Sequence, residues 1–249
     1  MGPDSGSPMG LEARPGEGAP GEGTPGEGAV SGLWDYRRQV ADLYHEVRAL
    51  ARHEEGRAAW LHWRAVRDRL FAGHAQSPVP AAQRRVFAGL TYFPYDPAWR
   101  LTATLETIAD GREERIDAGQ DGVVRLTPFA RSQGLAGRLG RELTLYWIGG
   151  YGGGVFLPFR DASAGQHTYG GGRYLLDTIK SADLGRDDDG RTVFDFNFAY
   201  NPSCVWSDLW VCPLAPDANR LNVPIMAGER WDAPATAPHT ALMAAEVLI

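Results

Sequence analysis

Apolar residues from Trp34 onward recur at spacings of three and four, which is the period of an amphipathic helix. The residues at these positions are Tyr36, Val40, Leu43, Tyr44, Val47 and Leu50. Ser31 stands before this run as a candidate N-cap. A second run at the same period follows Gly56 and ends near Gly73, with Trp60, Trp63, Val66 and Leu70 on its apolar face. The pattern predicts two helices within residues 34–73.

After Pro80 the period shortens toward two, and Gly and Pro interrupt short apolar runs. The candidate strands are Arg85–Tyr92, Arg100–Ile108, Val123–Thr127, Glu142–Ile148, Val155–Phe159, Thr192–Phe198 and Asn222–Ile225. The alternation is clearest in Glu142–Ile148, where Leu143, Leu145 and Trp147 are expected to share one face. No long helical pattern separates the runs. The expected fold is therefore mainly β within the α+β class, an antiparallel β-sandwich or barrel preceded by two amphipathic helices.

The two ends of the chain differ in composition from the rest. Residues 1–31 contain the pentapeptides PGEGA, PGEGT and PGEGA, without a large apolar side chain between them. Such a segment cannot bury enough surface to offset the entropy of ordering, so we expect a disordered acidic tail. Residues 32–231 are expected to form a single globular domain whose β-rich part spans 85–231. Residues 232–249 are interpreted as a C-terminal tail.

Composition limits the classes of function. The chain has 249 residues, of which 43% are hydrophobic, so it can bury a core within one domain. A formal net charge of -6 argues against proteins that wrap nucleic acid or bind an anionic membrane surface. The sequence also lacks a long apolar run and a signal-peptide pattern, and we therefore expect a cytoplasmic protein.

The stretch from Tyr151 to Asn222 concentrates the side chains that chemistry or recognition can use. Arg160 and Arg173 lie near glycine-rich turns, and the loop between them contributes Asp161, His167 and Tyr169. A strand that ends at Phe159 would place these groups at the rim of the sheet, where binding sites lie in such folds. Two interpretations stay open: an anion site based on the arginines, or an internal Arg–Asp pair that fixes the loop. Hairpin turns explain the glycine clusters more simply than a phosphate loop.

A second group of polar residues lies in the segment DFNFAYNP, where polar and aromatic residues alternate. In a strand, Asp195 and Asn197 would share one face, either in solvent or in a polar cavity, and Asn201 follows four residues later. Asp195 or Asp161 could then act with His167 as acid and base. One sequence does not show whether these residues are near one another.

The chain has two cysteines, Cys204 and Cys212. A disulfide, half of a zinc site completed by His167 and Asp208, a nucleophile paired with His167, and structural thiols are all compatible with their spacing. The expected cytoplasmic location favours reduced thiols. The sequence identifies no metal site and no cofactor.

Several multi-residue runs occur in one order along the chain: FAGLTYFPYDPAWR, PFRDASAGQHTYGGGRYLLD, DFNFAYNPSC and CPLAPDANRL. These runs resemble the motifs of a family of bacterial and archaeal proteins known only as a domain of unknown function. The resemblance covers about two thirds of the chain, roughly His62 to Arg230. It implies a single domain and supplies no activity, cofactor or catalytic residue.

The sequence therefore predicts a pocket that binds a small anionic or polar ligand. Its candidate binding residues are Arg160, Tyr169, Arg173, Asn197 and Asn201. The alternative is a hydrolase or isomerase-like enzyme with Asp161, His167 and Asp195 as its acid and base, and a further alternative is a structural or partner-binding module. The oligomeric state stays open.

Overall fold

The structure is a computed structural model that describes residues 27–52, 56–117, 122–207 and 211–231. Most of the expected N-terminal tail and the whole of the expected C-terminal tail lie outside these residues. The N-terminal boundary differs from the prediction because the first helix begins at Glu27, before residue 32.

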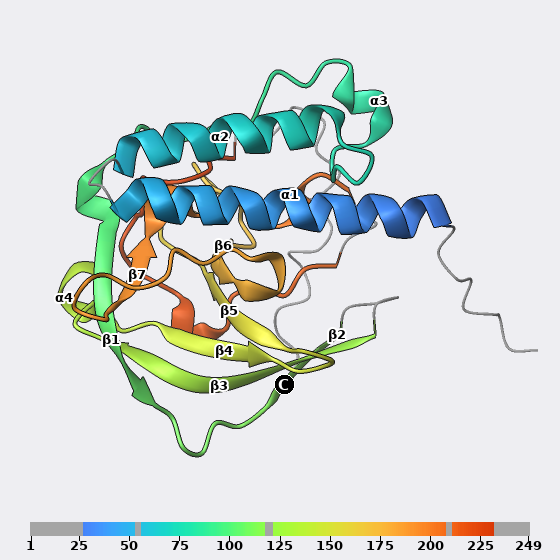
Figure 1. Cartoon of the computed structure of the whole chain (residues 1–249). Coiled ribbons are helices and arrows are strands. Elements are labelled where there is room, and N and C mark those ends of the chain that lie inside the picture. Colours follow the sequence, from blue (N-terminus) through green and yellow to red (C-terminus); the bar gives the residue numbers. More distant parts are fainter. Residues whose placement is uncertain (1–26, 53–55, 118–121, 208–210, 232–249) are drawn as a thin grey trace, which may run out of the picture.

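Two long helices lie side by side across one side of the molecule (Figure 1). They are α1 (Glu27–Arg52) and α2 (Gly56–Gly73), which confirms the two helices expected from the periodicity. Ser31 lies inside α1, so its prediction as the N-cap was wrong. The other α-helices of the described residues are the short α3 (Ala81–Arg84) and α4 (Ala136–Leu139).

The remainder of the fold is an antiparallel sheet. Its strands are β1 (Arg100–Thr107), β2 (Glu114–Asp117), β3 (Val123–Gln133), β4 (Thr144–Ile148), β5 (Gly154–Phe159), β6 (Arg173–Asp177) and β7 (Thr192–Asp195). They are ordered β6-β5-β4-β3-β1-β7, and β2 pairs with β3 beside this path. The backbones of Tyr174 and Tyr200 form an isolated antiparallel bridge between β6 and the segment that follows β7. This bridge brings the two ends of the sheet together as a nearly closed barrel, in agreement with the expected fold class.

Two apolar cores lie on opposite faces of the barrel wall. One core lies between the wall and the helices and includes Trp63 of α2, Tyr146 and Phe156. The other core includes Leu145, Leu157 and many further residues from the opposite face of the same strands. Neighbouring strand residues such as Phe156 and Leu157 belong to different cores because successive side chains point to opposite faces of a strand. The helices therefore cover a sheet that is apolar on both faces.

Burial on both faces also corrects the expected pattern of β4. Leu145 and Tyr146 are both buried, whereas Trp147 is 43% exposed. The strict division into an apolar and a polar face was therefore wrong, because this strand separates the two cores.

Three predicted strands differ from the structure. Arg85–Tyr92 was wrong, since this segment continues α3 with turn hydrogen bonds and only Tyr92 forms a bridge. Asn222–Ile225 is not a strand, and the backbone of Ile225 bonds instead to the side chains of Asp161 and Arg173. Thr192–Phe198 was half right: β7 ends at Asp195, and Phe196–Phe198 form a 3-10 helix.

Within the described part of the chain, no helix combines the length and apolar composition needed to cross a membrane.

Candidate functional site

Asp161 and Arg173 form a buried ion pair at the end of β5 and the start of β6. Arg173 Nη2 donates to Asp161 Oδ2 at 2.9 Å, and both side chains are almost completely buried. Arg173 also donates to the carbonyl oxygens of Ile225, Ala227 and Glu229. Asp161 in turn accepts from the backbone and hydroxyl of Ser163 and from the backbone of Ile225. Burial lowers the pKa of Arg173, and the charge of Asp161 opposes this shift. The pair therefore holds the C-terminal segment against the barrel, and Arg173 does not reach a solvent-facing rim.

Glycine is required at the turn that precedes Arg173. Gly172 has φ +94°, and an added Cβ would lie 2.5 Å from the carbonyl oxygen of Phe159. Both the left-handed conformation and the close backbone approach exclude a larger residue. This turn therefore serves the packing of β6 on β5, which agrees with the hairpin interpretation of the glycine cluster.

Asp195 and Asn197 lie in a second buried network. Asp195 accepts from the backbone and the side-chain amide of Asn197 and from Arg100. The side-chain amide of Asn197 also donates to the backbone carbonyl of Asp96. Its side-chain oxygen accepts from the backbone N–H of Asp96. Burial raises the pKa of Asp195, against the hydrogen bonds of Asn197 and the charge of Arg100. These contacts close the 3-10 turn after β7, and both residues are completely buried.

The remaining predicted residues are dispersed. His167 is exposed, and Arg160 Nε donates to the carbonyl of Gly170 at 2.8 Å. Tyr169 packs edge-to-face on Trp231 and lies 3.9 Å from the sulfur of Cys204. Asn201 is buried, and its side-chain amide donates to the carboxylate of Glu229. The structure thus joins Asp161 to Arg173 and Asp195 to Asn197, but it does not assemble the expected residues in one site.

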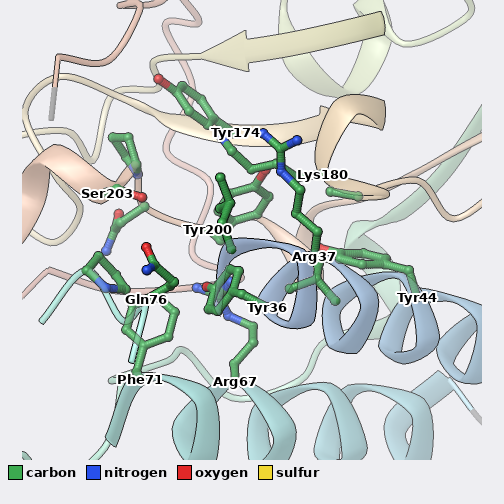
Figure 2. Close-up of a pocket in the computed structure, with 16 residues that line it drawn as sticks. Tyr36, Arg37, Tyr44, Arg67, Phe71, Gln76, Tyr174, Lys180, Tyr200 and Ser203 are labelled. Carbon is green, nitrogen blue, oxygen red and sulfur yellow. The ribbon is translucent and has the colours of Figure 1, made fainter. Parts of the chain in front are cut away.

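A cavity of about 260 Å³ lies between α1, the end of α2 and one edge of the barrel, and of the predicted binding residues Asn201 lines it. Figure 2 shows its sixteen lining residues. The helices and the loop after α2 contribute Leu33, Tyr36, Arg37, Val40, Tyr44, Arg67, Phe71, Gln76 and Pro78, and the barrel side contributes Tyr174, Lys180, Ala182, Tyr200, Asn201, Pro202 and Ser203. The volume exceeds the roughly 150 Å³ of cavities that accept benzene. The cavity is therefore large enough for a small organic molecule.

The wall of the cavity is mainly aromatic and aliphatic, and its charged groups are all cationic. Arg67 is paired with Glu229 at 2.6 Å, and the side chain of Lys180, which is 55% exposed, is paired with Asp177 at 2.8 Å. Burial lowers the pKa of Lys180, but the charge of Asp177 outweighs this effect and the pKa is raised. Arg37 forms no ion pair with the described residues and is exposed beside the cavity. A positive charge thus remains available at the opening.

Two buried polar atoms of lining residues have no hydrogen-bond partner in the described part of the chain: the hydroxyl of Tyr200 and Oδ1 of Asn201. Tyr200 is 8% exposed and Asn201 is 5% exposed. Burial raises the pKa of Tyr200 well above its ordinary value, so this hydroxyl keeps its proton and can donate. Buried polar groups are nearly always paired, and an unpaired one costs about 1–3 kcal/mol. These atoms are the strongest sign of a binding site in the cavity.

Sequence reasoning missed most of these residues. Tyr36 and Tyr44 were placed on the apolar face of an amphipathic helix, where such residues usually pack in a core, and Phe71 was not singled out. Two features of the sequence could have pointed to the lining of the cavity: Lys180, the single lysine of the chain, and the motif that contains Tyr200 and Asn201.

The two cysteines are free and close together. The backbone N–H of Cys204 donates to Sγ of Cys212 at 3.4 Å. No group of three or more His, Cys, Asp or Glu residues in the described ranges could hold a metal ion. Of the weak candidates for a metal site, Cys204 and Cys212 meet, His167 does not join them in such a group, and Asp208 lies outside the described residues.

Much of the chain is similar to known proteins. Residues 85–230 match the model of DUF1684, described as a protein of unknown function, and this match spans more than half of the chain. The chain belongs to this family. The matched DUF1684 region contains the barrel side of the cavity, whereas α1 and α2 precede it.

A solved structure supports the same relationship. The solution NMR structure of an uncharacterized protein of Haloarcula marismortui is similar to this DUF1684 member, with 33% sequence identity and a TM-score of 0.51. The similarity covers 74% of this chain and 98% of the archaeal protein. No match was found among curated proteins.

Proposed function

We propose that this DUF1684 protein binds a small organic anion, with an apolar body and a carboxylate, in the cavity between α1 and the barrel. The observation that carries the proposal is the buried hydroxyl of Tyr200, a residue that lines the cavity, because this hydroxyl has no hydrogen-bond partner among the described residues. A ligand oxygen in the cavity would supply that partner.

The lining residues define the ligand class. Aromatic side chains such as Tyr36 and Phe71 favour an apolar body, since ligand sites are mainly apolar with a few placed polar groups. Among the residues that the structure describes, Arg37, Arg67 and Lys180 line the cavity and no carboxylate does. Arg67 and Lys180 have acidic partners, so Arg37 is the cation best placed to pair with the carboxylate of a ligand.

The acid–base alternative receives no support from the geometry. Asp161 and Asp195 lie in separate buried networks, and His167 is exposed. Binding without turnover is therefore the function we infer. The net charge of -6 agrees with a small-molecule ligand rather than nucleic acid, and the free cysteines agree with a cytoplasmic location.

The test is calorimetric titration of the full chain with phenylacetate, 4-phenylbutanoate and octanoate, each compared with its neutral primary amide. We expect saturable binding of at least one carboxylate and binding at least tenfold weaker for its amide. Arg37→Met should weaken carboxylate binding, whereas Arg38→Met, which removes a neighbouring exposed arginine that does not line the cavity, should leave it unchanged. Equal binding of acid and amide, or no binding of any of the six compounds, would contradict the proposal.

A further inference from the structure

The cysteine pair has a geometry that the binding function does not use. Cys204 lies in a 3-10 helix (Ser203–Val205), and its backbone N–H donates to Sγ of Cys212 at 3.4 Å. Because the chain has only two cysteines, each is the other's sole intramolecular thiol partner.

The two sulfurs have unequal surroundings. Cys204 is 8% exposed and contacts the hydroxyl of Tyr169, whereas Cys212 is only partly buried. The groups that act on Cys212 include the thiol and backbone N–H of Cys204 and the ammonium group of Lys180. Each of these groups favours a negative charge on the Cys212 sulfur. Reactive cysteines typically lie in such electropositive, partly exposed places.

The pKa values of the two thiols therefore shift in opposite directions. The hydrogen bond from the Cys204 thiol is the largest cause that lowers the pKa of Cys212 to about 6, assisted by the backbone N–H of Cys204 and the charge of Lys180. Burial opposes this shift. The same thiol–thiol hydrogen bond and burial raise the pKa of Cys204, which therefore keeps its proton.

We propose that Cys212 is a hydroperoxide-reactive thiolate and that Cys204 is the thiol that resolves it into a reversible disulfide. In the first step the Cys212 sulfur attacks the terminal oxygen of a hydroperoxide, ROOH. The O–O bond breaks, RO⁻ leaves, and Cys212 becomes a sulfenic acid. In the second step the sulfur of Cys204 attacks that of Cys212, the S–O bond breaks, and water leaves with the Cys204 proton. The two sulfurs lose two electrons and the peroxide gains them.

The thiolate is tested by timed alkylation of the reduced full chain with iodoacetamide across pH 4.5–9, with the modified cysteine located by mass spectrometry. Cys212 should reach half its maximal rate near pH 6, and at neutral pH it should react at least tenfold faster than Cys204. Half-maximal alkylation of Cys212 above pH 8 would contradict the proposal. This measurement needs no variant.

The resolving step is tested with hydrogen peroxide. The mass of the wild-type monomer should decrease by two hydrogen atoms, as an intramolecular disulfide requires. Dithiothreitol should then restore both thiols. Cys204→Ser should instead accumulate a sulfenic acid at Cys212 that dimedone traps, whereas Cys212→Ser should retain an unmodified Cys204. The proposal is wrong if the wild type keeps two free thiols at peroxide concentrations that oxidise free cysteine, or forms only intermolecular disulfides.

Discussion

Arg67 and Glu229 form a buried ion pair at 2.6 Å although 162 positions separate them in the chain. The guanidinium of Arg67 also lies over the rings of Trp63, Phe71 and Tyr200. Glu229 receives further hydrogen bonds from the backbone and side chain of Asn201. The pair therefore connects α2 to the C-terminal segment and to Asn201, which lines the cavity.

Loss of Arg67 should strongly destabilise the fold. Arg67→Met keeps most of the side-chain volume but leaves the carboxylate of Glu229 buried without its charge partner, at a cost of about 3 kcal/mol or more. Arg69→Met on the exposed face of the same helix is the control, and it should change the free energy of unfolding by less than about 0.5 kcal/mol. Urea unfolding measures both. Equal stability of the two variants would show that the pair contributes little.

Arg173 should prove to be a structural residue. Arg173→Lys removes the planar guanidinium that donates to Asp161 and to the carbonyls of Ile225, Ala227 and Glu229, so we expect a loss of about 3 kcal/mol or more. Arg186→Lys at an exposed position is the control. An unchanged melting temperature for Arg173→Lys, together with weaker anion binding, would restore its role as a ligand-binding residue.

Two acidic residues should give pH dependences of opposite sign. Burial raises the pKa of Asp195, so the folded protein holds this proton at a pH where the unfolded chain has lost it. Its contribution to stability should therefore fall as the pH rises from about 3.8 through the folded pKa. Burial raises the pKa of Asp187, but hydrogen bonds from Arg191 outweigh it and the pKa is lowered, so its contribution should be lost as the pH falls below about 3.8.

The measurement is the free energy of unfolding against pH for the wild type, Asp195→Asn and Asp187→Asn. The difference between wild type and Asp195→Asn should decline with rising pH, and the difference for Asp187→Asn should increase. If the difference in free energy of unfolding between the wild type and Asp195→Asn instead increased with pH, the hydrogen-bond and charge partners of Asp195 would lower its pKa more than burial raises it.

The elements that depend on local periodicity were predictable from the sequence. The two helices and the strands at Arg100, Val123 and Val155 follow from patterns within one element. The segment after Asp195 was not predictable in this way. Its alternation resembles a strand, but the Asp195 carboxylate caps a 3-10 turn by accepting from the backbone of Asn197. The formation of a 3-10 turn instead of a strand also depends on Asp96, which is 101 positions away and accepts a hydrogen bond from Asn197.

The candidate site was less predictable because its parts are far apart in the chain. Arg173 had two interpretations, and the choice between them depends on carbonyls more than 50 positions later. The cavity exists only because α1 lies against the edge of the barrel. An aromatic residue of α1 such as Tyr36 has the same sequence pattern whether it packs in a core or lines a cavity.

Tyr200→Phe tests the central claim most directly, with Tyr174→Phe as the matched control. Both tyrosines are buried and line the cavity, but the Tyr174 hydroxyl donates to Pro213, whereas that of Tyr200 has no partner within the described ranges. Calorimetry should show that the stability of Tyr200→Phe is unchanged or higher by on the order of 1 kcal/mol. The same variant should bind the tightest of the tested carboxylates at least fivefold more weakly than the wild type. Tyr174→Phe should instead lose about 1 kcal/mol of stability. Carboxylate affinity that is unchanged in Tyr200→Phe would contradict the account.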